Sequence, residues 1–287
     1  MLGVIGGSGV YQLEHLEAVE ERVVSTPFGD PSGPIRTGRI GATPVAFIPR
    51  HGPGHRYSPT DLPYRANIFA MKEVGVTHLL SISAVGSLRE EMPPRTRVLP
   101  DQIIDRTLRG DRSFFTDGIV AHVGLADPYC PLLRNAVGQA GSASGHPIEM
   151  GGTYICIEGP QFSTRAESNL YRGWGASVIG MTAMPEARLA REAELCSATL
   201  ALVTDYDVWH ESEEDVTVDL VLGHLRANSA AAASIIVALA EGGLPERGCK
   251  CGTALAGAIM TDPSLVTGSQ RSVLGALGAR VTTVDRS

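Results

Sequence analysis

The residues of this chain that could do chemistry lie directly after short apolar runs. Asp205 and Asp207 follow the nearly all-apolar run 198–203, which is typical of a strand buried on both faces of a parallel sheet. Carboxylates at the carboxyl end of such a strand lie where open α/β sheets bind their ligands. Aspartate is also a common turn former and helix cap, so this segment alone favours a structural role.

A second group of polar residues could bind an anion. Arg50 and His51 begin a loop rich in glycine and proline after an expected strand at 44–48, and both residue types are strong donors to oxyanions. The glycine-rich turn 6–9, with the Ser8 hydroxyl, could add backbone donors. That turn matches neither the dinucleotide-binding pattern G-x-G-x-x-G nor the Walker pattern. A solvated loop and an ordinary tight turn are the alternative interpretations.

The elements that must position these residues alternate between strands and helices. We predict strands at 2–5, 44–48, 78–83, 98–104, 154–157, 177–180 and 198–203, and helices at 61–74, 132–139, 164–171, 185–195 and 216–241. Pro100 indicates a bulge or an edge, and residues 106–124 form an irregular loop that carries His122. The pattern predicts an α/β fold with a parallel sheet covered by helices on both sides.

Charge and hydropathy narrow the classes of partner. The chain has 287 residues, 24 of them basic and 31 acidic, for a net charge of -7 and no long basic run. We therefore expect small-molecule partners and no nucleic acid. No apolar run approaches the roughly 20 residues of a membrane-spanning helix, and no charged segment precedes an apolar stretch at the N-terminus. These features predict no membrane partner and a cytoplasmic location.

The five cysteines fall into two groups. Cys130, Cys156 and Cys196 lie apart in apolar settings, so we expect buried free thiols. The C-x-C pair Cys249 and Cys251 could close a strained, redox-active ring or bind a soft metal. A zinc site normally needs a second pair of ligands at comparable spacing, and none is visible in the sequence. We therefore predict no metal site.

Seven segments occur in the same order as the motif series of a known family. They are Gly-Gly-Ser-Gly at 6–9, Thr-Pro-Phe-Gly at 26–29, Arg-His-Gly at 50–52, Ala-Val-Gly-Ser-Leu-Arg-Glu-Glu at 84–91, Glu-Gly-Pro-Gln-Phe-Ser-Thr-Arg-Ala-Glu at 158–167, Met-Thr-Ala-Met-Pro-Glu at 181–186 and Thr-Asp-Tyr-Asp at 204–207. The series resembles that of the S-methyl-5'-thioadenosine phosphorylases, in the trimeric purine nucleoside phosphorylase branch. The resemblance is collinear from residue 1 to about residue 239.

This resemblance implies a fold of the nucleoside phosphorylase type. That fold is a single-domain, three-layer α/β structure with a central, mostly parallel, mixed and twisted sheet flanked by helices. Residues 1–242 would form the phosphorylase domain, and residues 243–287 a C-terminal extension packed on the same domain. The family also implies a homotrimer or a dimer of trimers.

The resemblance also implies a role for each matching position. Phosphate would be bound by Ser8, Arg50, His51, Ser83, Ala84 and Thr182. The nucleoside would contact Phe162, Met181, Thr204, Asp205 and Asp207, with His122, Val218, Val221 and Leu222 near the 5' substituent, partly from a neighbouring subunit. Asp205 would face N7 and Asp207 the 6-amino group, and both would be catalytic. Serine stands at positions 8 and 83, where many relatives have threonine, and it keeps the hydroxyl.

The implied reaction is phosphorolysis of S-methyl-5'-thioadenosine to adenine and 5-methylthioribose 1-phosphate. Phosphate attacks the anomeric carbon, the sugar gains positive charge, and the departing ring must accept a proton. A carboxyl group whose pKa is raised by burial could supply that proton, and we predict Asp205 for this role. Phosphate is a co-substrate, and no metal or organic cofactor is required.

Two other functions stay open at this point. The substrate could be another 5'-substituted adenosine, such as 5'-deoxyadenosine or a 5'-halogenated one, or adenosine itself, because the motifs for phosphate, ribose and base do not read the 5' group. The chain could instead be a purine sensor without turnover. A sensor has no need to hold phosphate beside the anomeric carbon, so Arg50 and His51 argue against it.

Overall fold

The computed structural model describes residues 1–7, 16–210 and 218–279, with the side chains of residues 218–222 and 225 outside it. Its strands are β1 (Leu2–Gly6), β2 (Glu17–Arg22), β3 (Ile35–Ile40), β4 (Thr43–Pro49), β5 (His78–Ser87), β6 (Arg97–Leu99), β7 (Gln102–Arg106), β8 (Glu149–Met150), β9 (Thr153–Ile157), β10 (Val178–Gly180) and β11 (Cys196–Asp205). Its helices are α1 (Tyr64–Glu73), α2 (Pro131–Ala143), α3 (Arg165–Gly173), α4 (Ala183–Glu192), α5 (Val218–Glu241) and α6 (Gly268–Leu277). Short 3₁₀ helices lie at Asp207–Trp209, Lys250–Thr253 and Pro263–Leu265.

The strands form one mixed sheet with a parallel centre. Strands β4, β1, β5 and β11 run parallel to one another in that order. Strands β2 and β3 extend one side in antiparallel fashion. On the other side, β10 pairs antiparallel with the end of β5 and leads to the parallel strands β9 and β7. This arrangement confirms the expected α/β fold with a mostly parallel, mixed sheet.

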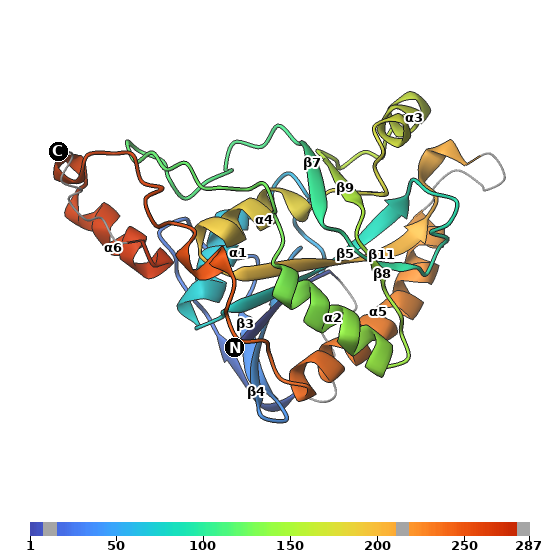
Figure 1. The fold of residues 1–287 in the computed structure, drawn as a ribbon, viewed down its shortest axis with the longest axis horizontal. Helices are drawn as coiled ribbons and strands as arrows, with labels where there is room; N and C mark the ends of the chain where they lie inside the picture. The colour runs from blue at the N-terminus through green and yellow to red at the C-terminus, as the bar shows by residue number, and fades with distance from the viewer. Residues whose placement is uncertain (8–15, 211–217, 280–287) are drawn as a thin grey trace.

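Helices cover both faces of the sheet, which gives three layers (Figure 1). Helices α2 and α5 cover one face, where Leu133 and Ile236 pack with Val4. Helices α1, α4 and α6 cover the other, where Phe69 packs with Ile5. Val4 and Ile5 are neighbours on β1, so their side chains must point to opposite faces. All ten residues of β11 are buried, which confirms the strand predicted from its apolar run.

Several element boundaries differ from the predictions. Strand β5 continues to Ser87 instead of ending at residue 83, because β10 and β11 pair with its far end. The strand predicted at 98–104 is two strands, separated at Pro100, that pair with different neighbours. Helix α1 begins at Tyr64 instead of residue 61, directly after Pro63. Strand β2 escaped prediction because all of its side chains are exposed and it lacks apolar alternation.

Helix ends were predicted more closely where a capping signal exists. The sequence offers Ser163 or Thr164 as the cap of the helix that runs to residue 171. Thr164 is the residue that caps α3, and it forms a capping box with Glu167. Helix α4 spans Ala183–Glu192, so Pro185 lies in its first turn as expected, although the helix ends before residue 195. Helix α5 is described from Val218 onward, and the predicted start at 216 lies outside the described residues.

The C-terminal segment packs first against the α2–α5 face, through Leu244 and Cys251, and from Leu255 on against the α1–α4 face. Leu255, Val266, Leu274 and Leu277 are buried in the same cluster as Ile5. Figure 1 shows this segment running beside α1 and α4 before it ends in α6. Among the described residues, no helix combines the length and apolar character needed to cross a membrane.

The prediction of buried free thiols at Cys130, Cys156 and Cys196 is confirmed. Cys130 and Cys196 are distant in the sequence but neighbours in the fold, because the turn before α2 is hydrogen-bonded to the start of β11 through Cys130 N–H and Ser197 C=O, 2.8 Å apart. Their sulfur atoms approach those of Cys249 and Cys251 in the C-terminal segment. All five cysteines are free thiols, and Cys156 lies in a different part of the core.

Candidate active site

A cavity of about 270 Å³ opens beside the carboxyl ends of the central strands. The structure brings together on its wall most of the residues predicted to bind phosphate or nucleoside: Arg50, His51, Ser83, Ala84, Phe162, Met181, Thr182, Thr204, Asp205 and Asp207. They come from the loop after β4, from β5, from the segment after β9, from the β10–α4 junction and from the end of β11. Residues separated by more than 150 positions therefore share one site.

Five predicted residues are not placed at this cavity. Ser8 lies outside the described residues, although Gly7 lines the cavity. The side chains of Val218, Val221 and Leu222 also lie outside the described part. His122 is exposed and is not among the lining residues, and its backbone N–H donates to Ala258 in the C-terminal segment at 2.8 Å.

Arg50 is the most strongly held cation at the cavity. Its side chain is 2% exposed, and Nε and Nη2 donate to the two carboxylate oxygens of Glu186 at 2.5 and 3.1 Å. Nη2 also donates to Ser81 Oγ, and Nη1 donates to the carbonyl of Ile82 at 2.7 Å. Burial opposes the charge of Arg50, but Glu186 outweighs it and raises the pKa of Arg50. Since Nη1 carries two hydrogens, one N–H is left without an acceptor among the described residues.

Glu186 received no role from the sequence, although it lies in one of the matching motifs. Its only local signal is that it is an acidic residue among apolar ones in the first half of α4, all of which is buried. A buried carboxylate needs a charged partner, and Arg50 lies 136 residues away in sequence. The ion pair fixes the arginine plane before any ligand arrives.

His51 is neutral at physiological pH and has a defined tautomer. Burial, followed by the charge of Arg50, lowers the pKa of His51 to about 4. Its Nδ1 lies 2.9 Å from the carbonyl oxygen of Tyr57. A carbonyl only accepts hydrogen bonds, so Nδ1 carries the hydrogen and Nε2 is an acceptor. The ring stacks on His55 at 4.2 Å between centroids, which fixes its plane.

Hydroxyl groups complete this end of the cavity. Ser83 Oγ lies 3.3 Å from Thr182 Oγ1 and 3.1 Å from the hydroxyl of Tyr154. All three side chains are buried. Hydroxyl hydrogens rotate to suit their partner, so the cluster can present donors to an oxyanion in the cavity. Tyr154 was not identified from the sequence, because it lies in the middle of an apolar strand, where a tyrosine is unremarkable.

The two carboxylates at the end of β11 have different surroundings. Asp205 accepts hydrogen bonds from Thr204 Oγ1 at 2.7 Å and from the backbone N–H of Asp207 at 2.8 Å. Both bonds favour its ionised form. Oδ2 of Asp207 is buried and makes no hydrogen bond of good geometry with the described residues. Burial, together with the charge of Asp205, raises the pKa of Asp207 to about 6.

A glycine lets β5 approach these carboxylates. A Cβ atom at Gly86 would lie 2.9 Å from Oδ1 of Asp205 and 3.0 Å from the side chain of Ile179. Any larger residue would displace one of these groups. The pairing of β11 with β5 also shifts register between Val203 and Asp205, which is typical of a bulge that re-aims a side chain at a site.

The cavity therefore has two chemically different ends. Arg50 donates to the carbonyl of Ile82, whereas Asp205 lies against Gly86, four residues further along β5. The guanidinium therefore lies toward one end of the cavity, and the carboxylate pair, with one raised pKa, lies toward the other. Met181, Ile82 and the half-exposed Phe162 supply apolar surface to the cavity wall. Such a site can hold an oxyanion and a protonatable ring on opposite sides of one reacting carbon.

Comparisons with known proteins agree with this class of fold. Residues 1–241 match the family described as the phosphorylase superfamily. The S-methyl-5'-thioadenosine phosphorylase of Geobacter sulfurreducens is 52% identical over 267 residues, which cover 93% of each chain. That of Cereibacter sphaeroides is 50% identical over 284 residues and covers 98% of each chain.

Solved structures give the same result. A methylthioadenosine phosphorylase from an antarctic soil metagenomic library has a TM-score of 0.90 and 44% identity, covering 96% of this chain and 98% of its own. The Schistosoma mansoni enzyme in complex with adenine has a TM-score of 0.80 and 35% identity, covering 84% of this chain and 90% of its own. Fold and site thus define a nucleoside phosphorylase. Within that class, the chain belongs to the S-methyl-5'-thioadenosine phosphorylase family.

Proposed function

We propose that this enzyme cleaves the N-glycosidic bond of S-methyl-5'-thioadenosine with inorganic phosphate, releasing adenine and 5-methylthioribose 1-phosphate. The observation that carries the proposal is the single cavity that has oxyanion donors at one end and a carboxylate pair at the other. In the reaction, a phosphate oxygen forms a bond to the anomeric carbon while the bond from that carbon to N9 breaks. The electron pair of the broken bond goes to the purine, which takes up a proton at N7.

Phosphate binds at the hydroxyl end. Ser83 and Thr182 donate through their hydroxyls, and Arg50 donates through its remaining Nη1 hydrogen. Because Nε2 of neutral His51 is an acceptor, it suits a phosphate oxygen that still carries hydrogen. Ala84 and Ser8 complete the proposed set, through backbone and hydroxyl donors. The bound anion then stabilises the positive charge that develops on the sugar.

The purine binds at the carboxylate end. We assign the proton in the free site to Asp207, whose pKa of about 6 keeps part of it protonated near neutral pH. Asp207 gives this proton to N7, while Asp205, which accepts two hydrogen bonds, stays ionised and accepts a hydrogen bond from the protonated ring. The competing assignment, predicted from the sequence, makes Asp205 the acid that faces N7. In both, the 6-amino group of adenine donates to a carboxylate, whereas a 6-oxo group would meet it with lone pairs.

Adenine release measured with and without phosphate tests the reaction. We expect turnover only with phosphate, and a sugar 1-phosphate signal by phosphorus NMR in equal amount to adenine. Turnover without phosphate would identify a hydrolase and refute the proposal. Ser83→Ala should raise KM for phosphate more than KM for the nucleoside, while the exposed Ser269→Ala should change neither.

The 5' group is read elsewhere. We propose that Met181 and Phe162 contact ribose and base, with Thr204 beside them, and that His122, Val218, Val221 and Leu222 surround the methylthio group, partly from a neighbouring subunit. A ratio of kcat/KM values for methylthioadenosine, 5'-deoxyadenosine and adenosine tests this preference. A higher value for adenosine would overturn it.

We further propose a homotrimer, alone or paired into a hexamer. Phe162, Leu170 and Trp174 are large apolar side chains left about half exposed within one short segment, as expected of an interface. Sedimentation should give three or six times the chain mass of 30.3 kDa. We also propose that residues 243–287 are an extension of the 1–242 phosphorylase domain. The reaction needs no metal or organic cofactor. The enzyme acts in the cytoplasm, in the salvage of purine and of the methylthio group.

A further inference from the structure

Four cysteine sulfurs meet at a point far from the cavity. Sγ of Cys249 lies 3.6 Å from Sγ of Cys130 and 3.4 Å from Sγ of Cys196. With Cys251, all four sulfur atoms lie within 4.8 Å of one another. The fifth cysteine, Cys156, belongs to a separate core cluster. No step of the proposed reaction uses any of them.

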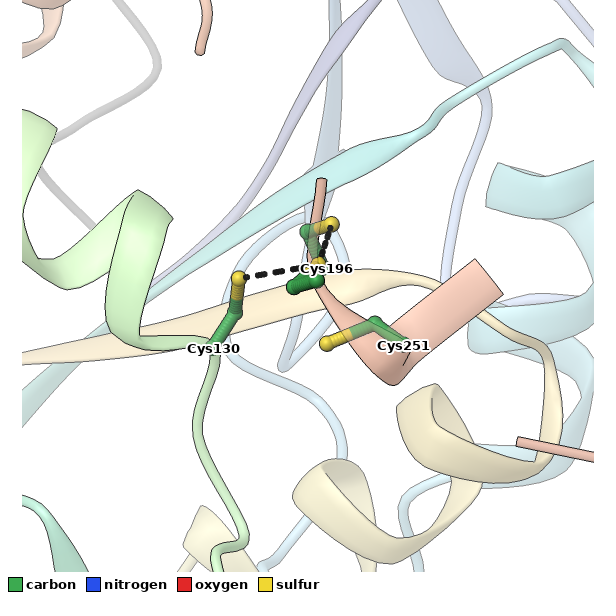
Figure 2. A group of neighbouring side chains, drawn as sticks. Cys130, Cys196 and Cys251 are labelled. Atoms are coloured by element: carbon green, nitrogen blue, oxygen red, sulfur yellow. Dashed lines mark hydrogen bonds between the residues drawn. The ribbon is translucent and has the colours of Figure 1, made fainter. Parts of the chain in front are cut away.

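The four cysteines come from three separate parts of the chain. Cys130 is the N-cap of α2, Cys196 is the first residue of β11, and Cys249 and Cys251 flank the start of the 3₁₀ helix Lys250–Thr253. Figure 2 shows the labelled Cys130, Cys196 and Cys251 pointing toward one another from these elements. Cys130, Cys196 and Cys251 are at most 2% exposed, so water has little access to the centre of the group.

The sulfur separations fit a tetrahedral metal site better than disulfides. A zinc–sulfur distance of about 2.3 Å places the sulfurs of a tetrahedral site about 3.8 Å apart. The observed separations of 3.4 and 3.6 Å, and an upper limit of 4.8 Å for every pair, lie around that value. A disulfide requires about 2.05 Å between sulfurs. Four ligands in a closed, buried group are typical of structural zinc.

Groups around the sulfurs suit the negative charge of thiolates. Cys130 is the N-cap of α2, so its sulfur lies at the N-terminus of that helix, and a helix N-terminus favours negative charge. Nη1 of Arg191 lies 3.7 Å from the sulfur of Cys251 and donates to it. Four thiolates around one Zn²⁺ leave two negative charges, which such donors stabilise.

We propose that Cys130, Cys196, Cys249 and Cys251 bind one Zn²⁺ ion as a structural site. Binding exchanges four thiol protons for the metal, with no change in oxidation state. The ion joins the C-terminal segment to α2 and to the central strand β11. It lies at the opposite end of β11 from Asp205, about 30 Å away at 3.3 Å per residue, so it has no part in the chemistry.

Metal analysis of the full-length enzyme tests the proposal. The protein is purified under reducing conditions and without a metal-affinity step, and its metals are measured by plasma mass spectrometry. We expect about one zinc per chain, since the four cysteines provide a complete ligand set. The variants Cys249→Ser and Cys251→Ser should each reduce zinc to a small fraction of this value. The matched control Cys156→Ser should retain it.

Cobalt substitution tests the wild-type chain in case the variants do not fold. The zinc is removed with a chelator and Co²⁺ is added. Four sulfur ligands should give intense visible bands of tetrahedral cobalt, at saturation with one Co²⁺ per chain. The proposal would be overturned if the wild-type protein, freed of zinc and then given Co²⁺, showed none of these bands. Disulfides among the four cysteines would also overturn the proposal. They would be detected in peptides from protein that is purified under reducing conditions and then digested without reductant. Iron at the same stoichiometry would overturn the choice of zinc.

Discussion

Replacing Asp207 by asparagine should stabilise the ligand-free enzyme, and more so as pH rises. Asp207 is buried, and its pKa is raised from 3.8 to about 6. Between these values the folded protein binds more protons than the unfolded chain, so the wild type loses stability as pH increases. This difference in the pKa of Asp207 between the unfolded and the folded chain is worth about 3 kcal/mol of stability, of which about 2 kcal/mol is lost between about pH 4.5 and pH 7.5.

Asparagine keeps the shape of the side chain but cannot ionise. Asp207 has φ of 54°, in the left-handed region that asparagine also tolerates. Its backbone N–H can still donate to Asp205. The stability of Asp207→Asn relative to the wild type should therefore rise by about 2 kcal/mol across that pH range, or roughly 4–8 °C in Tm.

Thermal and urea unfolding in phosphate-free buffers would measure this difference. The pH dependence is the relevant quantity, because any effect of the amide itself on packing is the same at each pH. The exposed Asp127→Asn is the matched control, for which we expect little change with pH. A difference between Asp207→Asn and the wild type that stays constant with pH would show that Asp207 does not titrate abnormally. It would also remove the reason to assign the proton to Asp207.

Three further predictions concern the other polar groups of the site. Asp205→Asn should lower kcat/KM for methylthioadenosine by about 100-fold or more and shift preference toward the 6-oxo analogue. An unchanged ratio of the kcat/KM values for the two nucleosides would show that Asp205 does not contact the base. Glu186→Gln should lower the free energy of unfolding in urea by about 3–5 kcal/mol, because Arg50 is left buried without its counter-charge. The control Glu20→Gln breaks the exposed pair with Arg22 and should lower it by under about 1 kcal/mol. Nitrogen NMR should show His51 neutral, with its hydrogen on Nδ1, down to about pH 4. The contribution of His51 to stability therefore falls as pH decreases from about 6.5 to 4. A titration midpoint of His51 near pH 6.5 would contradict the buried site.

The sequence was sufficient where a pattern is local. The all-apolar run before Asp205 predicts a strand buried on both faces, and β11 is buried at every position. The polar residues after Pro49 and Gly180 follow from the same rule, because strand ends of a parallel sheet meet at one edge. These local signals were enough to point to Arg50 and Asp205, whereas Thr182 was implied by the family resemblance.

The sequence was insufficient where partners are distant. Glu186 is a carboxylate in a buried helix turn, and only the fold shows that Arg50 is its partner. The cysteines illustrate the same limit. Counting ligand pairs along the chain finds Cys249 and Cys251 but no second pair, because Cys130 and Cys196 are single residues that become neighbours only when α2 docks on β11.

The two groups at the ends of β11 should act independently. Coupling between distant sites needs an element that can adopt two arrangements. Strand β11 is buried along its whole length and pairs in parallel with β5 from Cys196 to Val203, so it offers one arrangement. Loss of the proposed zinc ion should therefore lower stability through the C-terminal segment while leaving KM for phosphate unchanged. Conversely, Asp207→Asn should abolish turnover without changing zinc content. The strand thus separates the structural role of its first residue from the chemistry at its last.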